Sequence, residues 1–408
     1  MKVCLISSGF DERNRMKQPW LYLLQGAHAL NHNGHKVFLV SDGYPRLAKM
    51  GILEELLVIR IHSTREWFLT GNKLLESAID NLRPDIVIWH LGLTSFFRLN
   101  TLFRLSAPVI GIFTSPIYKP EELLRLGAMR LLKRLGLSAV HLVGLFIPSA
   151  MIQRTIKQGS IKKLVIESEI TRKRLMEKGI SANSLRVIKP YIDPIWFQER
   201  LTLSNRIRVR EELGFSRDDF VVAYFGPPTP LRGLPVLIDA FNTAIQKNPH
   251  LRLLVLSRQN KGEQNPDYIK VLKLIKNNHL LQKVHLMPGT LSKARLIQYL
   301  SVCDVIALPF QLVPSDIPIS ILEAMTLEIP LITSDVACLV EMVPEDTGLR
   351  LPPGDSNLLA EAILKLSSDS KLREKLSRRG KEHVLSWTSI SESNRAWNNL
   401  VLSNETEL

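Results

Sequence analysis

The sequence predicts an α/β protein built from two doubly wound domains that face a cleft. The chain has 408 residues, which is too long for one compact core. Short apolar runs typical of buried parallel strands alternate with helical segments along the chain. The alternation starts again after a polar segment at 198–205, so we expect a first domain at 1–200 and a second at 206–386. We expect the last segment, 387–408, to cross back onto the first domain as a helix.

Composition and charge narrow the classes of ligand. Hydrophobic residues make up 45% of the chain and charged residues 23%, as in ordinary folded proteins. The 53 Lys and Arg residues outnumber the 39 Asp and Glu residues. The net charge of +14 favours phosphate-bearing ligands, nucleic acid or an anionic membrane, and scattered charges that only aid solubility are the alternative. Because the chain has no run of interleaved aromatic and basic residues and no nucleic-acid motif, we expect no nucleic acid partner.

The three cysteines, Cys4, Cys303 and Cys338, are far apart in the sequence and lie in apolar runs. This spacing is typical of buried free thiols rather than of a disulfide framework or a metal site, and it indicates a reducing cytoplasm. The first apolar strand begins directly after Met1 and Lys2, so no secretion signal is expected. The sequence therefore predicts a cytoplasmic protein.

In the first domain, polar residues follow the carboxyl ends of predicted strands. Gly9 follows the strand at 3–6, and a glycine there lets the backbone approach a ligand closely. His90 and Thr114 follow two later apolar runs. Ligands of open α/β sheets bind outside these ends, so both residues are candidates for the acceptor side. For His90, acceptor binding or proton transfer competes with a histidine that only satisfies hydrogen bonds at a strand end.

A basic helix is expected at 121–135, with Arg125, Arg130, Lys133 and Arg134. It precedes an apolar segment at 137–152, which is short for a membrane span. Such a pair can lie on an anionic membrane surface, and this would place the protein peripherally on the inner face of the membrane. The alternative is an ordinary buried helix with a solvated basic face.

One stretch of the second domain has the pattern of an anion site. An apolar strand at 305–308 is followed by a polar loop with Ser315 and Asp316, and a helix begins near Pro318. The first N–H groups of a helix point outward at the positive end of its dipole and bind anions. Glu323 places a carboxylate further along this helix, where it can accept hydrogen bonds from sugar hydroxyls. Together these features predict a nucleotide-sugar pocket.

Arg232 adds a cation to this pocket. It follows the strand that ends at Gly226, so both residues should face the cleft. Its fork of donors suits a diphosphate, and neutralising a diphosphate leaving group lowers the barrier to sugar transfer. The sequence has no carboxylate pair placed for glycoside hydrolysis, no metal-ligand cluster and no Asp-x-Asp triplet. We therefore expect metal-independent chemistry, with a nucleotide sugar as substrate and no cofactor.

The chain resembles the family 4 glycosyltransferases, also described as glycosyl transferases group 1, which have the GT-B fold of two Rossmann-like domains. The resemblance covers nearly the whole chain. In the first domain it rests on Gly34-His35-Lys36-Val37, Pro84-Asp85-Ile86-Val87, Ser168 with its helix, and 187–193. In the second it rests on Phe225-Gly226, Arg232-Gly233, Pro288-Gly289, 303–309, Leu322-Glu323-Ala324-Met325, 329–332, Val340-Glu341, Gly348-Leu349 and Pro353-Gly354-Asp355.

The resemblance implies transfer of a sugar from a UDP- or GDP-linked donor with retention at the anomeric carbon, and we expect a lipid-linked or polysaccharide acceptor. It implies that Arg232 takes the place of the usual phosphate-binding lysine. Glu323 takes the place of the second glutamate of the Glu-x7-Glu pattern, on the ribose. Ile319 and Ser320 would offer backbone N–H groups near the diphosphate, and Leu291 would lie near the base.

The sequence departs from the family pattern around the donor. Pro227 stands where the family often has a phosphate-binding arginine, and Arg258 is the candidate replacement. Ser315 stands at the first glutamate of the Glu-x7-Glu pattern, which contacts the donor sugar. Asp316 follows it, at a common glycine position. Arg232 and Asp316 are the residues that we expect to serve catalysis.

Two other functions stay open. The departures at Pro227, Ser315 and Thr114, where the family often has arginine, glutamate and histidine, also suit a catalytically silent GT-B protein that binds a nucleotide or a partner. A GT-B epimerase would instead isomerise a sugar nucleotide with an internal acid–base pair and without an acceptor.

Overall fold

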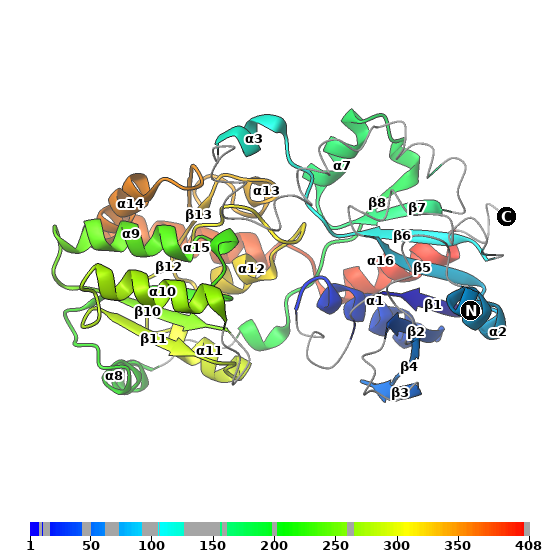
Figure 1. The fold of residues 1–408 in the computed structure, drawn as a ribbon, viewed down its shortest axis with the longest axis horizontal. Helices are drawn as coiled ribbons and strands as arrows, with labels where there is room; N and C mark the ends of the chain where they lie inside the picture. The colour runs from blue at the N-terminus through cyan, green and yellow to red at the C-terminus, as the bar shows by residue number, and fades with distance from the viewer. Residues whose placement is uncertain are drawn as a thin grey trace.

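A computed structural model of the chain contains two α/β units, each built on its own sheet (Figure 1). The structure describes residues 1–7, 10, 17–42, 50–61, 73–91, 105, 107–125, 156, 161–197, 202–258 and 265–403. Most strands are buried on both faces by flanking helices, which explains why they read as continuous apolar runs in the sequence.

The first sheet has the strand order β3-β4-β2-β1-β5-β6-β7-β8, and only β3 is antiparallel to its neighbour. Its strands are β1 (Lys2–Ile6), β2 (Lys36–Asp42), β3 (Met50–Leu53), β4 (Leu56–Ile61), β5 (Ile86–Leu91), β6 (Val109–Phe113), β7 (Ile161–Ile166) and β8 (Leu185–Val187). The described helices of this unit are α1 (Trp20–His32), α2 (Lys73–Leu82), α3 (Pro120–Arg125) and α7 (Glu169–Glu177), with short 3-10 turns η4 (Ala182–Ser184) and η5 (Pro194–Phe197).

The second sheet is parallel throughout and has the order β11-β10-β9-β12-β13-β14. Its strands are β9 (Phe220–Gly226), β10 (Leu251–Ser257), β11 (Val284–Pro288), β12 (Val305–Leu308), β13 (Leu331–Ser334) and β14 (Leu349–Leu351). Its helices are α8 (Leu203–Glu212), α9 (Leu234–Ile245), α10 (Pro266–Asn277), α11 (Lys293–Leu300), α12 (Ile319–Thr326), α13 (Leu339–Met342), α14 (Ser356–Ser368) and α15 (Ser370–Leu385), with a 3-10 turn η6 (Pro230–Arg232).

The last described helix, α16 (Ile390–Leu402), lies against α1 of the first unit (Figure 1). Trp397 is fully buried there, and its ring centroid is 5.5 Å from that of Tyr22. Gly26 faces the same indole, and a Cβ at this position would come within 2.8 Å of it. At the edge of the contact, His35 Nε2 and Asn398 Oδ1 are 2.8 Å apart. The C-terminal helix therefore completes the core of the first unit.

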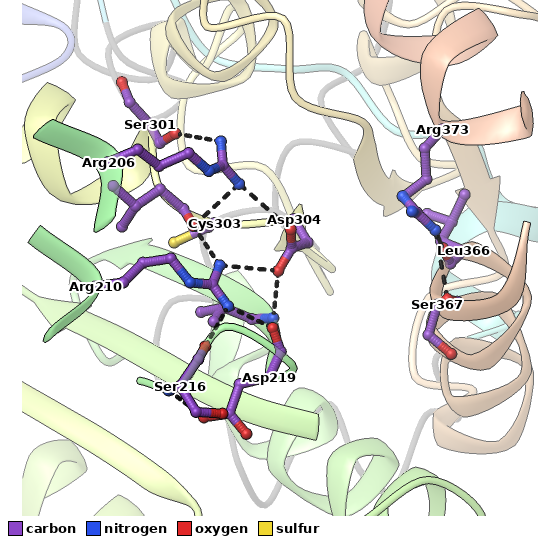
Figure 2. A network of polar contacts seen from close by, with 12 residues as sticks. Arg206, Arg210, Ser216, Asp219, Ser301, Cys303, Asp304, Leu366, Ser367 and Arg373 are labelled. Atoms are coloured by element: carbon purple, nitrogen blue, oxygen red, sulfur yellow. Dashed lines mark hydrogen bonds and ion pairs between the residues drawn. The ribbon is translucent and has the colours of Figure 1, made fainter. Parts of the chain in front are cut away.

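A network of arginines and aspartates holds the base of the second sheet, at the amino ends of β9 and β12 (Figure 2). Arg206 and Arg210 project from α8, and Asp304 immediately precedes β12. Asp304 Oδ1 is 3.4 Å from Arg206 Nη2, and Asp304 Oδ2 is 3.3 Å from Arg210 Nη1. Asp304 Oδ2 also accepts a hydrogen bond of 2.8 Å from Val221 N, and Arg210 donates to the Asp219 carbonyl. The network fixes α8 to the sheet.

Helix α8 begins earlier than the sequence predicted. The polar segment at 198–205 was expected to mark the boundary between the two domains. The helix instead starts at Leu203, because Thr202 Oγ1 accepts a hydrogen bond of 3.4 Å from Asn205 N and caps it. The polar composition of this segment therefore gave no indication that the first turn of α8 lies within it.

Within the described residues, no helix is both long enough and apolar enough to cross a bilayer. The basic side chains of Arg125, Arg130, Lys133 and Arg134 and the apolar segment 137–152 lie outside the part of the chain that the structure describes. The expected membrane contact of this segment stays a prediction.

Candidate functional site

The site lies at the carboxyl edge of the second sheet, where β9 and β10 end side by side at Gly226 and Ser257. Arg258 N donates a hydrogen bond of 2.9 Å to the Gly226 carbonyl, which places Arg258 next to the end of β9. Gly226 has φ of 125°, and a Cβ there would collide with Nη1 of Arg232. Glycine is therefore needed at the end of β9 to leave room for the guanidinium of Arg232.

Two contacts orient the Arg232 side chain toward the amino end of α12. Its Nη2 donates a hydrogen bond of 2.6 Å to Ser320 Oγ, and its Cζ lies 4.9 Å from the centre of the Phe310 ring. Gly233, with φ of 77°, follows directly, and a Cβ there would collide with the Pro309 carbonyl. This close approach fixes the turn that carries Arg232 against the loop after β12.

The amino end of α12 offers free backbone donors. Pro318 occupies the N-cap position, and its side chain makes no capping hydrogen bond. Among the described residues, the N–H groups of Ile319 and Ser320 have no acceptor. Unpaired N–H groups at the positive end of a helix dipole are suited to an anion.

Glu323 and Arg258 lie in the same electrostatic cluster as Arg232. Burial raises the pKa of Glu323 to about 7, and Arg258, Lys293 and Arg232 oppose this rise. Burial lowers the pKa of Arg258, and Glu323 opposes that change. Within the described residues, neither Arg232 nor Arg258 forms an ion pair with a carboxylate, whereas Lys293 pairs with Asp193 of the first unit. The cluster therefore contains two arginines with capacity for an added anion.

Leu291 lies two residues after Gly289, beyond the end of β11. It is partly buried against the core of the second unit. Gly289 has φ of 120°, and nothing lies within 4 Å of the position that its Cβ would take. Leu291 is therefore held at the same edge of the sheet as Gly226 and Arg258.

The predicted sugar-facing loop makes different contacts from those expected. Ser315 is buried, and its Oγ donates a hydrogen bond of 3.2 Å to the Ile317 carbonyl. Asp316 is fully buried, and its carboxylate accepts hydrogen bonds from Ser168 and Thr171 of the first unit. Asp316 was expected to face the donor sugar, but its oxygens are committed to the other unit.

The structure brings His90 and Thr114 together beside this loop. His90 Nε2 is 2.9 Å from Thr114 Oγ1, and Nδ1 is 3.5 Å from Ser7 Oγ. Burial lowers the pKa of His90 to about 4, so its imidazole is neutral near pH 7. The Thr114 carbonyl accepts a hydrogen bond of 2.6 Å from Asp316 N. His90 is thus a hydrogen-bonding group rather than a cation, and Gly9 lies outside the described residues.

Several contacts between the two units were missed by sequence reasoning. Tyr118 Oη donates to the Val313 carbonyl at 2.9 Å and accepts from Val313 N at 2.6 Å. Glu122 Oε1 accepts from Arg174 Nη2 at 2.8 Å and from Ala337 N at 3.1 Å. The partners lie far apart in the sequence, so no local pattern indicates them.

The part of the chain that the structure describes holds no group of three or more His, Cys, Asp or Glu side chains that could bind a metal ion. The positive groups at the site are instead arginine guanidinium and backbone N–H groups. Metal-independent chemistry stays a prediction.

Comparisons with known proteins agree with this geometry. Residues 205–383 match the model of the family described as glycosyl transferases group 1. The capsular polysaccharide biosynthesis glycosyltransferase CapM of Staphylococcus aureus is 26% identical over 187 residues, which are 46% of this chain and 47% of CapM. The chain spans about half the length of the curated relatives it matches.

Solved structures share the fold over the whole chain. Sucrose-phosphate synthase from Thermosynechococcus elongatus matches with a TM-score of 0.77 at 18% identity, over 100% of both chains. HepE of Anabaena, solved with UDP and glucose, matches with a TM-score of 0.72 at 16% identity, also over 100% of both chains. These likenesses confirm the predicted fold of two Rossmann-like units, so the chain has the GT-B fold.

The family model matches the second unit at 205–383, so it shows a likeness of that unit to glycosyl transferases group 1. The narrower assignment to family 4 stays a prediction.

Proposed function

We propose that this chain is a glycosyltransferase that moves a sugar from a UDP- or GDP-linked donor to a lipid-linked or polysaccharide acceptor, with retention at the anomeric carbon. One observation carries this proposal. Arg232 and Arg258, which have no carboxylate ion-pair partner among the described residues, lie with the N–H groups at the amino end of α12 and with Glu323 at the carboxyl edge of the second sheet. A diphosphate with an attached ribose suits this set of groups. HepE has also been solved with UDP-glucose, which supports a nucleotide-sugar donor.

In this proposal, Arg232 and Arg258 neutralise the diphosphate, and the N–H groups of Ile319 and Ser320 bind its oxygens. The same groups stabilise the negative charge that grows on the diphosphate as the glycosidic bond breaks. These groups supply the positive charge from the chain itself, which supports metal-independent transfer. Glu323 accepts hydrogen bonds from the ribose hydroxyls.

We assign the nucleotide base to the second unit and the acceptor to the first unit. Leu291 packs against the base, close to Gly226 at the end of β9. His90 and Thr114 border the acceptor side. The name of CapM supports a polysaccharide acceptor, and the basic segment at 121–135 supports peripheral contact with an anionic membrane surface.

The test is release of UDP or GDP from a panel of nucleotide sugars, with lipid-linked and oligosaccharide acceptors supplied. Wild type should release nucleotide with one donor, and Arg232→Ala should lower this rate by about a hundredfold, because a charged contact to the leaving group is lost. Arg378→Ala is the matched control, since Arg378 lies on α15 with 65% of its side chain exposed. Nucleotide binding without turnover for any donor would favour the catalytically silent alternative, and isomerisation without an acceptor would favour the epimerase.

A further inference from the structure

We propose that Asp316 is a positioning residue. Its carboxylate joins the loop before α12 to the amino end of α7 in the first unit, and so holds the donor-binding groups in the domain arrangement seen here. The assignment of the donor site rests on the proposed function. The link between the two units is a property of the fold and can be tested separately.

The carboxylate of Asp316 accepts four hydrogen bonds, and every donor belongs to the first unit. Oδ2 accepts from Glu167 N at 3.2 Å and from Ser168 N at 3.0 Å. Oδ1 accepts from Ser168 Oγ at 2.8 Å and from Thr171 Oγ1 at 2.6 Å. Ser168 is also the N-cap of α7, so the carboxylate sits at the positive end of that helix. A fully buried carboxylate with four donors is a strong and directional link.

The hydrogen bonds of Asp316 can act directly on the proposed donor site, because only a short stretch of chain separates Asp316 from the first turn of α12. Ile319, with its free N–H group, lies three residues after Asp316. The loop is also held from its other side, where Asp316 N donates to the Thr114 carbonyl at 2.6 Å. Val313 N donates to Tyr118 Oη at 2.6 Å. The first turn of α12 therefore cannot keep this position if the first unit moves away.

A second carboxylate from the second unit reaches the same helix. Glu341 Oε2 accepts a hydrogen bond of 3.1 Å from Ile170 N, in the first turn of α7, and Glu341 Oε1 lies 3.1 Å from Lys189 Nζ. Lys189 also lies 4.2 Å from the centre of the Trp387 ring. Glu341 therefore has a charged partner in Lys189, whereas the described donors to the Asp316 carboxylate are neutral.

The groups that face Asp316 make its link sensitive to protons. Burial raises the pKa of Asp316 to about 6, with Glu341 adding to the rise and the hydrogen bonds opposing it. Burial also raises the pKa of Glu167 well above its ordinary value, and Asp316 adds to this rise. Tyr22 on α1 and Cys338 before α13 face the same pair of carboxyls. Burial raises the pKa of each, and the pair of carboxyls adds to the rise.

These shifts give the direction of the pH effect. Asp316 and Glu167 hold protons more tightly in the joined arrangement than they would in water. Protonation therefore favours the joined arrangement, and this contribution is lost as the pH rises through about 6.

The experiment measures the distance between the two units in the full chain. Spin labels are placed at Glu177→Cys on α7 and Lys270→Cys on α10, which are exposed. The three native cysteines are buried, and burial raises the pKa of each thiol, so the labels attach selectively. Wild type should give one short distance, with a longer population that grows as the pH rises from about 4 to 7. Asp316→Ala should shift most molecules to the longer, broader distribution, and Asp316→Asn should retain much of the short distance but lose most of the pH dependence.

Binding of UDP, measured by calorimetry on the same proteins, tests the effect on the donor site. Asp316→Ala should weaken UDP binding about tenfold, within the usual range of coupling between linked sites. If wild type binds neither UDP nor GDP, the proposed function fails while the distances still decide the link. If Asp316→Ala keeps the wild-type distance and UDP affinity, the inference is overturned and the proposed function stands.

A second variant, with a smaller change, keeps the proposal testable if Asp316→Ala does not fold. Thr171→Val removes one hydroxyl donor to Asp316 and keeps the shape of the side chain, so it should increase the long-distance population. Thr333→Val is the matched control, because Thr333 Oγ1 donates to the Leu308 carbonyl inside the second unit at 2.8 Å. An identical distance distribution in wild type and Thr171→Val, with an unchanged response to pH, would contradict the proposal.

Discussion

Asp304 and Asp316 flank the same strand, β12, and bind their surroundings in opposite ways. Asp304, at the amino end, pairs with two arginines of its own unit (Figure 2). Asp316, beyond the carboxyl end, is bound by four neutral donors from the other unit. At the first contact, positively charged guanidinium groups compensate the negative charge of Asp304. At the second, neutral N–H and O–H donors stabilise the negative charge of Asp316. At the second contact, burial raises the pKa of the Asp316 carboxyl to about 6.

The difference separates a contact within one folded unit from a contact between two units, which can break when the units move apart. The Asp304 network joins α8 to the sheet within the second unit, so a movement of one unit relative to the other leaves it intact. The Asp316 contact closes between two units, so it can break while both stay folded. Similar carboxylates thus serve stability at one end of the strand and position at the other.

The largest effect is expected at the base of the sheet. Arg210→Ala removes a guanidinium that pairs with Asp304 and donates to the Val302 carbonyl at 2.9 Å. Because a partly buried carboxylate and several carbonyls lose a donor, we expect a loss of about 2 kcal/mol in the free energy of unfolding. Thermal unfolding measures it, with Arg208→Ala as control, since Arg208 lies exposed on the same helix. Equal melting temperatures for the two variants would remove the contrast with Asp316.

The second effect concerns pH and the Asp316 carboxyl. Since its pKa is raised to about 6, ionising it in the folded protein costs stability, and the cost appears as the pH rises from about 4 to 7. Wild type should therefore lose stability relative to Asp316→Asn over this range, by on the order of 2 kcal/mol. Melting temperatures of both proteins at pH 5 and pH 7.5 provide the comparison. A difference that grows in the other direction would mean that the four donors outweigh burial.

The third prediction concerns Arg258, which has no carboxylate ion-pair partner among the described residues. Arg258→Ala should weaken UDP binding by about tenfold, because one charged contact to the diphosphate is lost. Arg378→Ala, on the exposed face of α15, should leave the affinity unchanged. Isothermal titration in low and high salt provides the measurement, and the salt dependence should be smaller for Arg258→Ala than for wild type. An Arg258→Ala protein with wild-type affinity would argue against Arg258 as the replacement for the arginine missing at Pro227.

The smallest effect is expected at His90. Since burial lowers its pKa to about 4, the imidazole should stay neutral from pH 5.5 to 8 and should add no charge to the acceptor side. NMR of ring-labelled histidine measures this directly. A titration of His90 near pH 6.5 would show that it is solvated and open to proton transfer.

Much of the fold and part of the site were predictable from the sequence. Apolar runs such as 305–308 predicted the strands, because strands covered on both faces have no polar positions. Arg232 and Glu323 were predictable because strand ends and helix starts in this fold have fixed places at the sheet edge. The link from Asp316 to Thr171 was not predictable, since 145 residues separate them and neither position has a local signal for the other.

The packing of α16 against α1 sets an order of events during synthesis. The strand β1 of the first unit precedes the second unit in the chain, but Trp397, which fills the space beside Gly26 and Tyr22, is translated only after the second unit. Domains usually fold as units from the N-terminus as the ribosome releases them. Here the first unit must wait with an incomplete core while the whole second unit is made. The core of the first unit is therefore completed only when α16 has been made. A chain that stops before α16 would leave the apolar surface of α1 exposed.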